Sequence, residues 1–272
     1  MKIRILGPKG TYSDIALDKY LENKDYKVEK EYCPSILSTI RNIKDGEYAI
    51  LPFENTLDGF VMESLDRIIE EELQILGQVK LGIDFCFVSN KKDLDKVNEC
   101  YVQFKTYGQC LDFISKHNFT YMKTDSNVQS KELFERKGNT ASAIIPMHLL
   151  KDMNVENVIY HIADSKHNET RFFIVKKGID PILDENSYNA SIVVFSKEDR
   201  KGLLYTILSV FHDSGINLKS ILSRPSKKDL GNYNFFLECM LKKEEIPLLN
   251  DAVKKLEDMD FVVKILGIYN DL

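Results

Sequence analysis

The stretch YAILPFENTLDGFVMESLDRIIEEEL, residues 48–73, contains a strand, a polar turn and a helix in immediate succession. Its first six residues are mostly apolar, and its last thirteen mix apolar and acidic residues as an amphipathic helix does. Between the two lie Glu54, Asn55 and Thr56. A strand that leads into a helix is the repeating unit of α/β proteins, and ligands bind at the carboxyl ends of such strands. The stretch therefore predicts an α/β fold with three polar candidates for a site.

The alternation of strands and helices extends in both directions from this stretch. The apolar pattern predicts strands at 2–6, 27–32, 83–89, 140–146 and 171–178, and helices at 13–21, 35–46, 106–117 and 126–138. Ser13, Ser35 and Ser126 are expected as N-caps, and Gly46 as the C-terminal stop of the second helix. This order predicts sheets whose strands are mostly parallel.

The pattern changes near residue 178. The segment 177–188 is polar and contains Gly178 and Pro181, which is typical of a linker. After it the order is strand, helix, strand, strand, helix, strand, at 190–196, 199–215, 216–225, 232–240, 246–259 and 261–269. This βαββαβ order predicts a ferredoxin-like domain. The domain contains no catalytic triad or metal-ligand spacing, so we expect it to bind a ligand or to regulate.

Composition excludes several classes of function. The 272 residues are 43% hydrophobic and carry a net charge of −5, so there is no basic excess for nucleic acid. The five cysteines lack CxxC spacing, which argues against disulfides and zinc and favours a cytoplasmic location. Neither a signal peptide nor a run of about eighteen apolar residues occurs, so no membrane partner is expected.

Two short segments besides the opening stretch are candidates for chemistry. GPKGTYS, residues 7–13, is a turn into a helix whose backbone N–H groups near Thr11 can face an anion, although an ordinary turn explains it equally well. HNETRFFIV, residues 167–175, places Thr170 and Arg171 at the start of an apolar strand. An arginine suits a carboxylate, whereas a threonine hydroxyl can assist a leaving oxygen only in a desolvated site with fixed geometry.

Other reactive residue types are weaker candidates. The five histidines show no i,i+4 pairing, and no serine lies in a GxSxG elbow. Cys110 is expected to be a core thiol rather than a nucleophile. On its own, the segment with Asn55 and Thr56 is better explained as an Asx-type turn that caps a helix. The short segments therefore need to be considered together.

In this order, four motifs closely resemble those of prephenate dehydratase with a C-terminal ACT domain. They are GPKGTYS (7–13), LPFENTLDGFVMESLD (51–66), GQC (108–110) and NETRF (168–172). The ACT-like segments are GLLYTILSVF (202–211), INLKSILSRP (216–225) and YNFFLE (233–238). The resemblance covers nearly the whole chain, and the order of the motifs makes it highly specific.

The resemblance implies a fold, a reaction and a regulator. It implies a two-lobed α/β domain related to type II periplasmic binding proteins, with lobe one at about 1–78 plus 164–178, lobe two at 79–163, a linker at 179–188 and an ACT domain at 189–272. The reaction converts prephenate to phenylpyruvate, water and carbon dioxide without cofactor or metal, because aromatisation drives it. L-phenylalanine is the expected inhibitor, and a homodimer or homotetramer through the ACT domains the expected assembly.

The resemblance also assigns roles to residues. Thr170 is expected to donate to the departing oxygen, with Asn55 and Gln109 as the other catalytic residues. Arg171 is expected to anchor a substrate carboxylate or to organise the site around Thr170. The full set of expected substrate-binding residues is Thr11, Ser13, Glu54, Thr56, Arg171 and Phe172. The expected effector-binding residues are Gly202, Leu203, Leu204, Asn217, Leu218, Ser223, Arg224 and Pro225.

The chain departs from the family pattern at two places. Val102, Gln103 and Phe104 stand where the family usually has serine, histidine and proline, and Lys105 next to them is a candidate for a compensating charge. In the ACT-like segments, Leu203 and Leu222 replace the usual alanine and glutamate. These departures leave three alternatives open: a non-aromatising prephenate decarboxylase, an arogenate dehydratase and a non-catalytic phenylalanine sensor. The retained Thr170 favours dehydration of prephenate.

Overall fold

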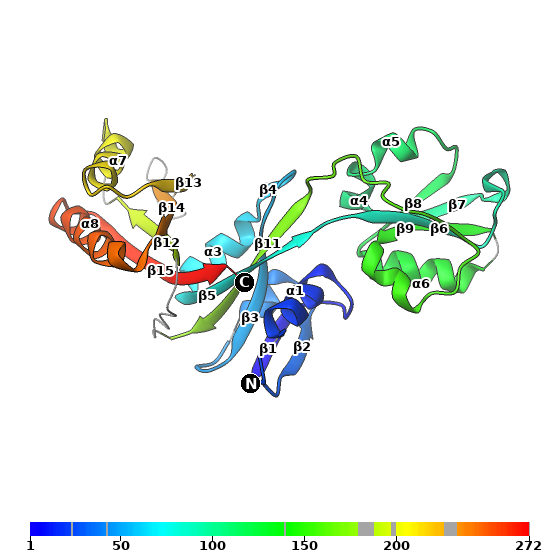
Figure 1. The fold of residues 1–272 in the computed structure, drawn as a ribbon, viewed down its shortest axis with the longest axis horizontal. Coiled ribbons are helices and arrows are strands. Elements are labelled where there is room, and N and C mark those ends of the chain that lie inside the picture. The colour runs from blue at the N-terminus through cyan, green and yellow to red at the C-terminus, as the bar shows by residue number, and fades with distance from the viewer. Residues whose placement is uncertain are drawn as a thin grey trace.

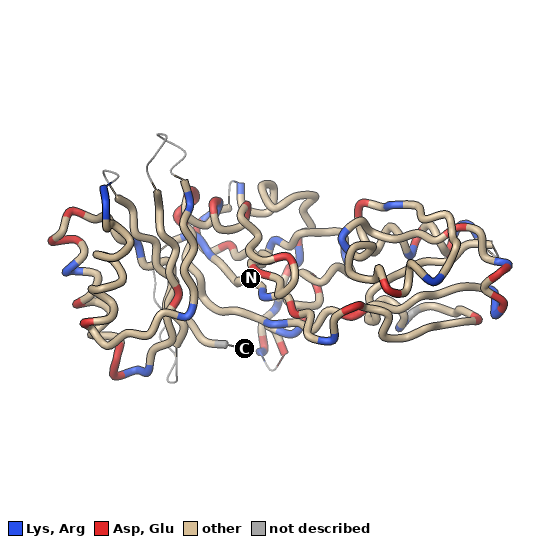
Figure 2. The backbone as a smooth tube through the Cα atoms, turned by 90° about the horizontal axis from the view of Figure 1, so that it is seen from above, with Lys and Arg blue, Asp and Glu red and all other residues tan. Residues whose placement is uncertain are grey.

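The computed structural model describes residues 1–22, 24–41, 43–138, 140–178, 188–196, 200–225 and 233–271. Three bodies follow one another along the long axis of the molecule (Figure 1): the C-terminal domain, a central lobe and a distal lobe. Seen from above, acidic and basic residues are interspersed over all three bodies (Figure 2). Among the described helices, none is long and apolar enough to cross a membrane.

The central lobe holds the N-terminal strands and helices. Its strands are β1 (Lys2–Leu6), β2 (Glu29–Cys33), β3 (Tyr48–Asn55), β4 (Gly59–Phe60), β5 (Leu73–Gly82) and β11 (Glu169–Lys177), and its helices are α1 (Tyr12–Leu21), α2 (Ile36–Ile40) and α3 (Met62–Glu70). The sheet order is β5-β11-β3-β1-β2. β1 pairs parallel with both neighbours, whereas β11 runs antiparallel to β3 and β5 because it returns from the distal lobe.

The distal lobe is inserted between β5 and β11. Its strands are β6 (Phe85–Ser89), β7 (Glu99–Gln103), β8 (Thr120–Thr124), β9 (Ala141–Pro146) and β10 (Asn157–Ile159). Its helices are η1 (Leu94–Lys96), α4 (Phe104–Gly108), α5 (Leu111–Ile114), α6 (Asn127–Lys137) and η2 (Met147–Asp152). The two strands β5 and β11 lead out of the central sheet toward this lobe (Figure 1), so the chain crosses between the lobes twice.

The C-terminal domain has the predicted βαββαβ order. Its elements are β12 (Tyr188–Phe195), α7 (Leu203–Asp213), β13 (Leu218–Pro225), β14 (Tyr233–Leu241), η3 (Lys243–Glu245), α8 (Ile246–Asp258) and β15 (Val262–Asp271). The strand order β13-β14-β12-β15 is antiparallel throughout. The predicted fold class, a two-lobed α/β domain followed by a ferredoxin-like domain, is confirmed.

The C-terminal sheet packs on the central lobe through a shared apolar cluster. Val193, Phe236, Leu266 and Tyr269 of the C-terminal strands belong to the same buried cluster as Phe53 and Phe173. The end of β15 also pairs with β5, at Asn270 with Gly77 and Asp271 with Gln78. The two domains therefore share one core and one strand pairing.

Several local expectations are corrected by the structure. The predicted helix 106–117 is two short helices, α4 and α5, and Gln109 lies between them. Ser13 is not an N-cap, because α1 begins one residue earlier and Thr11 takes that position. The second helix ends at Ile40, so Gly46 is not its stop but a turn residue with a φ of 82°.

Other local expectations hold or fall outside the described residues. The Ser35 side chain accepts from the Ser38 amide in a capping box, and the Ser126 side chain accepts from the Gln129 amide, so both predicted caps are confirmed. The strands β5, β7 and β8 were not predicted, because their apolar residues are interrupted by polar and charged ones. The predicted linker, with Pro181, lies almost entirely in 179–187, outside the described residues.

The backbones of the two domains approach each other closely at Gly267 of β15. A Cβ added there would overlap with the carbonyl oxygen of Ile75 in β5. We predict that Gly267→Ala lowers the free energy of unfolding by roughly 2 kcal/mol, since backbone atoms must move apart to admit the methyl group. Gly82→Ala is the control. Gly82 lies on β5, as Ile75 does, but nothing lies within 4 Å of its added Cβ. Equal melting temperatures for the two variants would contradict this packing.

Candidate active site

A cavity of about 360 Å³ lies where the two lobes of the N-terminal domain meet. The central lobe contributes the turn after β1, the end of β3 and the start of β11, through residues such as Thr11, Asn55 and Thr170. The distal lobe contributes the start of α4, the residue after α4 and the region before α6, through residues such as Lys105, Gln109 and Ser126. Segments more than 100 residues apart in the sequence thus line one cavity.

Asn55 and Thr170 are directly opposite each other in the paired strands β3 and β11. The Asn55 amide nitrogen donates to the Thr170 hydroxyl oxygen at 2.9 Å and to the Asn168 side-chain oxygen at 2.7 Å. Its carbonyl oxygen accepts from the backbone N–H groups of Leu57 and Asp58 at 2.9 and 3.0 Å. These two backbone donors fix which end of the amide is oxygen, so the nitrogen faces Thr170.

The orientation of Asn55 determines what the Thr170 hydroxyl can do. An amide nitrogen only donates, so the hydroxyl oxygen accepts in this contact and its own proton must point elsewhere. No described residue accepts that proton, and Thr170 lines the cavity. The hydroxyl is therefore available as a donor to a ligand atom.

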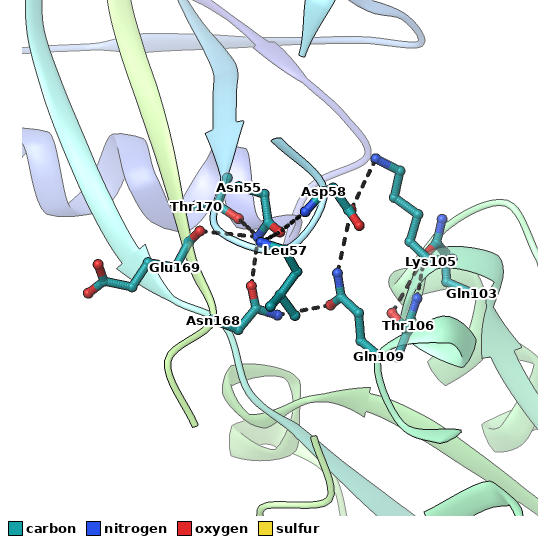
Figure 3. A network of polar contacts seen from close by, with 10 residues as sticks. All are labelled: Asn55, Leu57, Asp58, Gln103, Lys105, Thr106, Gln109, Asn168, Glu169 and Thr170. Atoms are coloured by element: carbon teal, nitrogen blue, oxygen red, sulfur yellow. Dashed lines mark hydrogen bonds and ion pairs between the residues drawn. The ribbon is translucent and has the colours of Figure 1, made fainter. Parts of the chain in front are cut away.

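A chain of polar side chains continues from this pair to the distal lobe (Figure 3). Asn168 donates to the Gln109 side-chain oxygen at 3.0 Å, and the Gln109 nitrogen lies 3.5 Å from an Asp58 carboxylate oxygen. The Lys105 ammonium lies 3.4 Å from the same oxygen. Asn168 is 2% exposed and was not among the predicted site residues, although the NETRF motif contains it. This series of hydrogen-bonded side chains joins the two lobes across the cavity.

The start of α1 forms another wall of the cavity. The Thr11 hydroxyl donates to the backbone oxygen of Leu6, which ties the turn to β1, and Ser13 is buried in the first turn of the helix. The first backbone N–H groups of a helix have no partner within the helix, and the helix dipole favours an anion there. This wall therefore suits a carboxylate.

His148 of the distal lobe contacts this turn. Burial lowers the pKa of His148, so the ring is neutral at pH 7. Its Nε2 lies 2.9 Å from the Gly10 carbonyl oxygen, and the neutral ring satisfies this contact by donating its N–H. The histidine thus adds a contact between the lobes without adding a positive charge to the cavity.

The segment that departs from the family pattern lies at the end of β7 and the start of α4. Val102 is fully buried in β7, and Phe104 is 59% exposed. The Gln103 side-chain oxygen accepts from the backbone N–H groups of Lys105 and Thr106 at 2.9 and 3.1 Å, so it caps α4. Gln103 and Lys105 both line the cavity, and the Lys105 side chain brings a positive charge to the lining.

Three predicted substrate-binding residues do not line the cavity. Successive side chains of a strand point to opposite faces, so Glu54 and Arg171 face away from Asn55 and Thr170. Arg171 is 6% exposed and pairs with Glu54 and with the C-terminal domain, so the expected contact with a substrate carboxylate is not made from this position. Thr56 instead bridges β11, where its hydroxyl donates to the His167 carbonyl at 2.9 Å and accepts from the Glu169 amide at 3.0 Å. Phe172 does line the cavity.

The predicted effector residues lie at both ends of the C-terminal domain. Gly202 precedes α7 with a φ of 81°, and Leu203 is buried in the domain core. Ser223 and Pro225 are at the end of β13, whereas Asn217 and Leu218 are at its start. The Arg224 guanidinium pairs with Asp66 of α3, so it contacts the central lobe. Leu204 is 39% exposed.

Comparison with known proteins shows the family. Residues 3–179 match the family model described as prephenate dehydratase, and residues 190–258 match the ACT domain model. The chain belongs to the prephenate dehydratase family. A prephenate dehydratase from Methanocaldococcus jannaschii is 32% identical to it over 266 residues, 96% of this chain and 95% of that protein.

Further relatives agree with the prephenate dehydratase family. A bifunctional chorismate mutase/prephenate dehydratase from Aquifex aeolicus is 29% identical, over 99% of this chain and 73% of that protein. The crystal structure of the prephenate dehydratase from Staphylococcus aureus superposes with a TM-score of 0.83 at 27% identity, over 99% of this chain and all of that one. The prephenate dehydratase of Arthrobacter aurescens in complex with L-Phe has the same fold, with a TM-score of 0.82 at 24% identity over 99% and 90% of the two chains.

Asp14 supports the wall formed by α1 and gives a pH-dependent prediction. Burial alone raises the pKa of Asp14, but hydrogen bonds from Lys30 at 2.8 Å and from the Gly10 amide at 2.9 Å outweigh burial, and the pKa is lowered. The ionised form therefore stabilises the folded state above the usual aspartate pKa, and this contribution is lost as the pH falls through the lowered one.

We predict that Asp14→Asn lowers the free energy of unfolding by about 2 kcal/mol at pH 7, and that the difference from the parent shrinks below about pH 4. Asp18→Asn is the control, because Asp18 also pairs with Lys30 but its side chain is 57% exposed. Denaturant unfolding across pH 3–7 measures both. A difference that stays constant down to pH 3 would show that the Asp14 charge has no such role.

Proposed function

We propose that the chain converts prephenate to phenylpyruvate, water and carbon dioxide, and that Thr170 is its central catalytic group. The observation that carries the proposal is the Asn55 amide, which donates to the Thr170 oxygen at the cavity wall and so leaves the hydroxyl proton free to be donated to a ligand. Membership of the prephenate dehydratase family supports it. The buried, unpaired state of all five cysteines fits a reducing cytoplasm, where we place the protein.

The reaction needs little from the protein. The bond between the ring and its carboxylate breaks, its electrons complete the aromatic ring, and the bond from the ring to the hydroxyl oxygen breaks. Negative charge develops on the departing oxygen, which takes up one proton overall to leave as water. A hydrogen bond from Thr170 stabilises that charge as it develops, and such a donor is most effective in a site that excludes water. Asn55 holds the donor in the required direction, and Gln109 holds Asn168 and through it Asn55.

The two carboxylates of prephenate need separate partners. Because Arg171 is outside the cavity, we assign one carboxylate to the backbone N–H groups at the start of α1, beside Thr11 and Ser13. We assign the other to Lys105, whose present partner Asp58 lies in the same lining. Asp58 and the substrate carboxylate then compete for one ammonium group.

We propose that L-phenylalanine inhibits this chain and that its site is completed by a second copy through the ACT domains. The antiparallel arrangement of α7 and β13 puts Gly202 at the end of the domain that holds Pro225, and Asn217 at the opposite end. An eight-residue strand spans roughly 26 Å, which exceeds the length of one amino acid, so one chain cannot close all these residues around one ligand. The Arthrobacter aurescens relative was solved with L-Phe bound, which supports this effector.

The direct experiment is turnover of prephenate by the purified full-length chain at neutral pH. Phenylpyruvate is followed by its absorbance in alkali, and mass spectrometry distinguishes it from the product of a non-aromatising decarboxylase. Arogenate is offered in parallel, and L-phenylalanine is added to test inhibition. Product no faster than the uncatalysed reaction would refute the proposed function.

We predict that Thr170→Val lowers kcat by 10²–10⁴-fold, about the contribution of a positioned proton donor, because it removes the hydroxyl but keeps the shape. Thr170→Ser keeps the hydroxyl and should retain most of the activity. Steady-state kinetics on both variants, with melting temperatures near the parent's, tests the role. Parental kcat in Thr170→Val together with a loss in Thr170→Ser would mean that the methyl group, not the hydroxyl, matters.

We predict that Lys105→Gln raises KM for prephenate about tenfold and changes kcat little, since one charge-assisted hydrogen bond to the substrate is lost. Lys105→Arg should keep KM within a few-fold of the parent. Lys116→Gln, in the same lobe and outside the cavity lining, is the matched control. An unchanged KM for the Lys105→Gln variant would place the substrate carboxylates elsewhere.

A further inference from the structure

The guanidinium of Arg171 is held in a two-pronged contact with a carboxylate of the other domain. Its two terminal nitrogens lie 2.7 Å from the two oxygens of Glu238, one nitrogen on each oxygen. The side chains are 7% and 1% exposed, so the pair is buried between β11 and β14. We call this pair the Arg171–Glu238 fork.

Polar groups from both domains surround the fork. On the guanidinium, the Gln78 side-chain oxygen accepts at 3.1 Å and a Glu54 oxygen accepts at 2.7 Å. On the carboxylate, the hydroxyls of Ser191 and Tyr269 lie 3.3 and 3.2 Å from one Glu238 oxygen. Both terminal nitrogens of the guanidinium thus have two partners each, which leaves Arg171 little freedom to rotate.

Aromatic rings and charge fix the arginine further. Its guanidinium carbon lies 5.0 Å and 5.3 Å from the ring centres of Phe53 and Phe173. Burial disfavours the charged form, but the bonds and the charge of Glu238 outweigh burial, and the pKa of Arg171 is raised. The arginine therefore stays charged at neutral pH.

Arg171 of the fork is one residue away from Thr170 on β11, and its other partner Glu54 is one residue away from Asn55 on β3. Thr170 pairs with Asn55 across β11 and β3, and the next pair in the register is Arg171 with Glu54. The pairing of β11 with β3 shifts register immediately after Arg171, whereas its pairing with β5 on the other side is continuous from Glu169 to Ile174. The irregular side of β11 is therefore the one on which Thr170 meets Asn55, and Arg171 lies directly beside the irregularity.

Stability alone is a poor explanation of such a fork. Replacing a buried ion pair by apolar side chains of similar size is often neutral or stabilising. Catalysis, in contrast, depends on donor geometry within about 0.5 Å, and displacements of this size cost activity more than they cost folding. A rigid contact beside a catalytic hydroxyl is therefore better explained by positioning.

We propose that Glu238, a residue of the ACT domain, is a positioning residue for the dehydration: through Arg171 it holds Thr170 and Asn55 in their reactive arrangement. The proposal rests on the proposed function of the cavity. It makes the C-terminal sheet a structural part of the active site from the face opposite the substrate, independently of any effector.

The test compares three variants of the full-length chain with the parent. Glu238→Gln keeps the shape of the Glu238 side chain and removes its negative charge. The double variant Arg171→Met with Glu238→Leu replaces the fork by apolar side chains and leaves no buried charge of the fork unpaired; Glu54 loses its arginine, but its side chain is 37% exposed to solvent. Leu266→Ala is the control, because Leu266 belongs to the same buried cluster between the domains but is not among the partners of Arg171. For each, kcat, KM for prephenate and melting temperature are measured at a temperature where the variant is folded.

We expect Glu238→Gln to lower kcat about tenfold or more with KM within about twofold of the parent. The double variant should recover most of the melting temperature but not kcat, and Leu266→Ala should lose melting temperature with kcat near the parent's. Recovery of kcat in the double variant would overturn the proposal, because the fork would then only neutralise charge. Equal loss of kcat in Leu266→Ala would overturn it as well.

The result for the parent keeps this proposal separate from the proposed function. A parent that does not turn over prephenate overturns both. A parent that does, together with parental kcat in Glu238→Gln, overturns only the positioning role. If the single variant fails to fold, the double variant decides by the same comparison of kcat and melting temperature.

Discussion

The alternation of side chains along β3 and β11 is the constraint on which the rest of the structure depends. Asn55 and Thr170 face the cavity between the lobes, and their neighbours Glu54 and Arg171 face the C-terminal domain. A shift of either strand by one residue would exchange the two faces. The same two strands therefore carry the catalytic candidates and the contacts with the C-terminal domain. The side chains on one face cannot shift along the strands without the side chains on the other face.

This arrangement explains why Arg171 is adjacent to Thr170 without lining the cavity. Its buried charge is balanced by Glu238 and Glu54, so the cavity needs another source of positive potential. We propose that the start of α1 and Lys105 supply it. A cavity with one ammonium, here paired with Asp58, and a set of backbone donors suits the proposed reaction, in which one carboxylate leaves and the other remains bound.

Much of the fold could be predicted from the sequence because its signals are local. The strand before Glu54 and the caps Ser35 and Ser126 rest on neighbouring residues, and the structure has them. The strands β7 and β8 escaped prediction, since they mix polar and apolar residues and are set by their parallel pairing with each other. The sequence around Gln109 predicts one amphipathic helix, whereas the folded protein has two short helices there, α4 and α5.

In the candidate site, too, the sequence predicts what local motifs determine and misses what tertiary contacts determine. The motif order brought Asn55, Gln109 and Thr170 together in the prediction, and in the structure all three line one cavity. Their geometry, and the use of Asn168 as the link between them, depend on contacts across more than 50 residues, which no local pattern encodes. The face of the strand to which Arg171 points was accessible to simple alternation, but the partner Glu238 was not, because the docking of the C-terminal sheet is a tertiary event.

A crystal structure of the full-length chain with an unreactive prephenate analogue tests the central claim most directly. The analogue should keep both carboxylates and the ring hydroxyl. The account predicts the hydroxyl oxygen about 3 Å from the Thr170 oxygen, the carboxylates at the start of α1 and at Lys105, and Arg171 still paired with Glu238. An Arg171 side chain that has left Glu238 and binds a carboxylate of the analogue would contradict it.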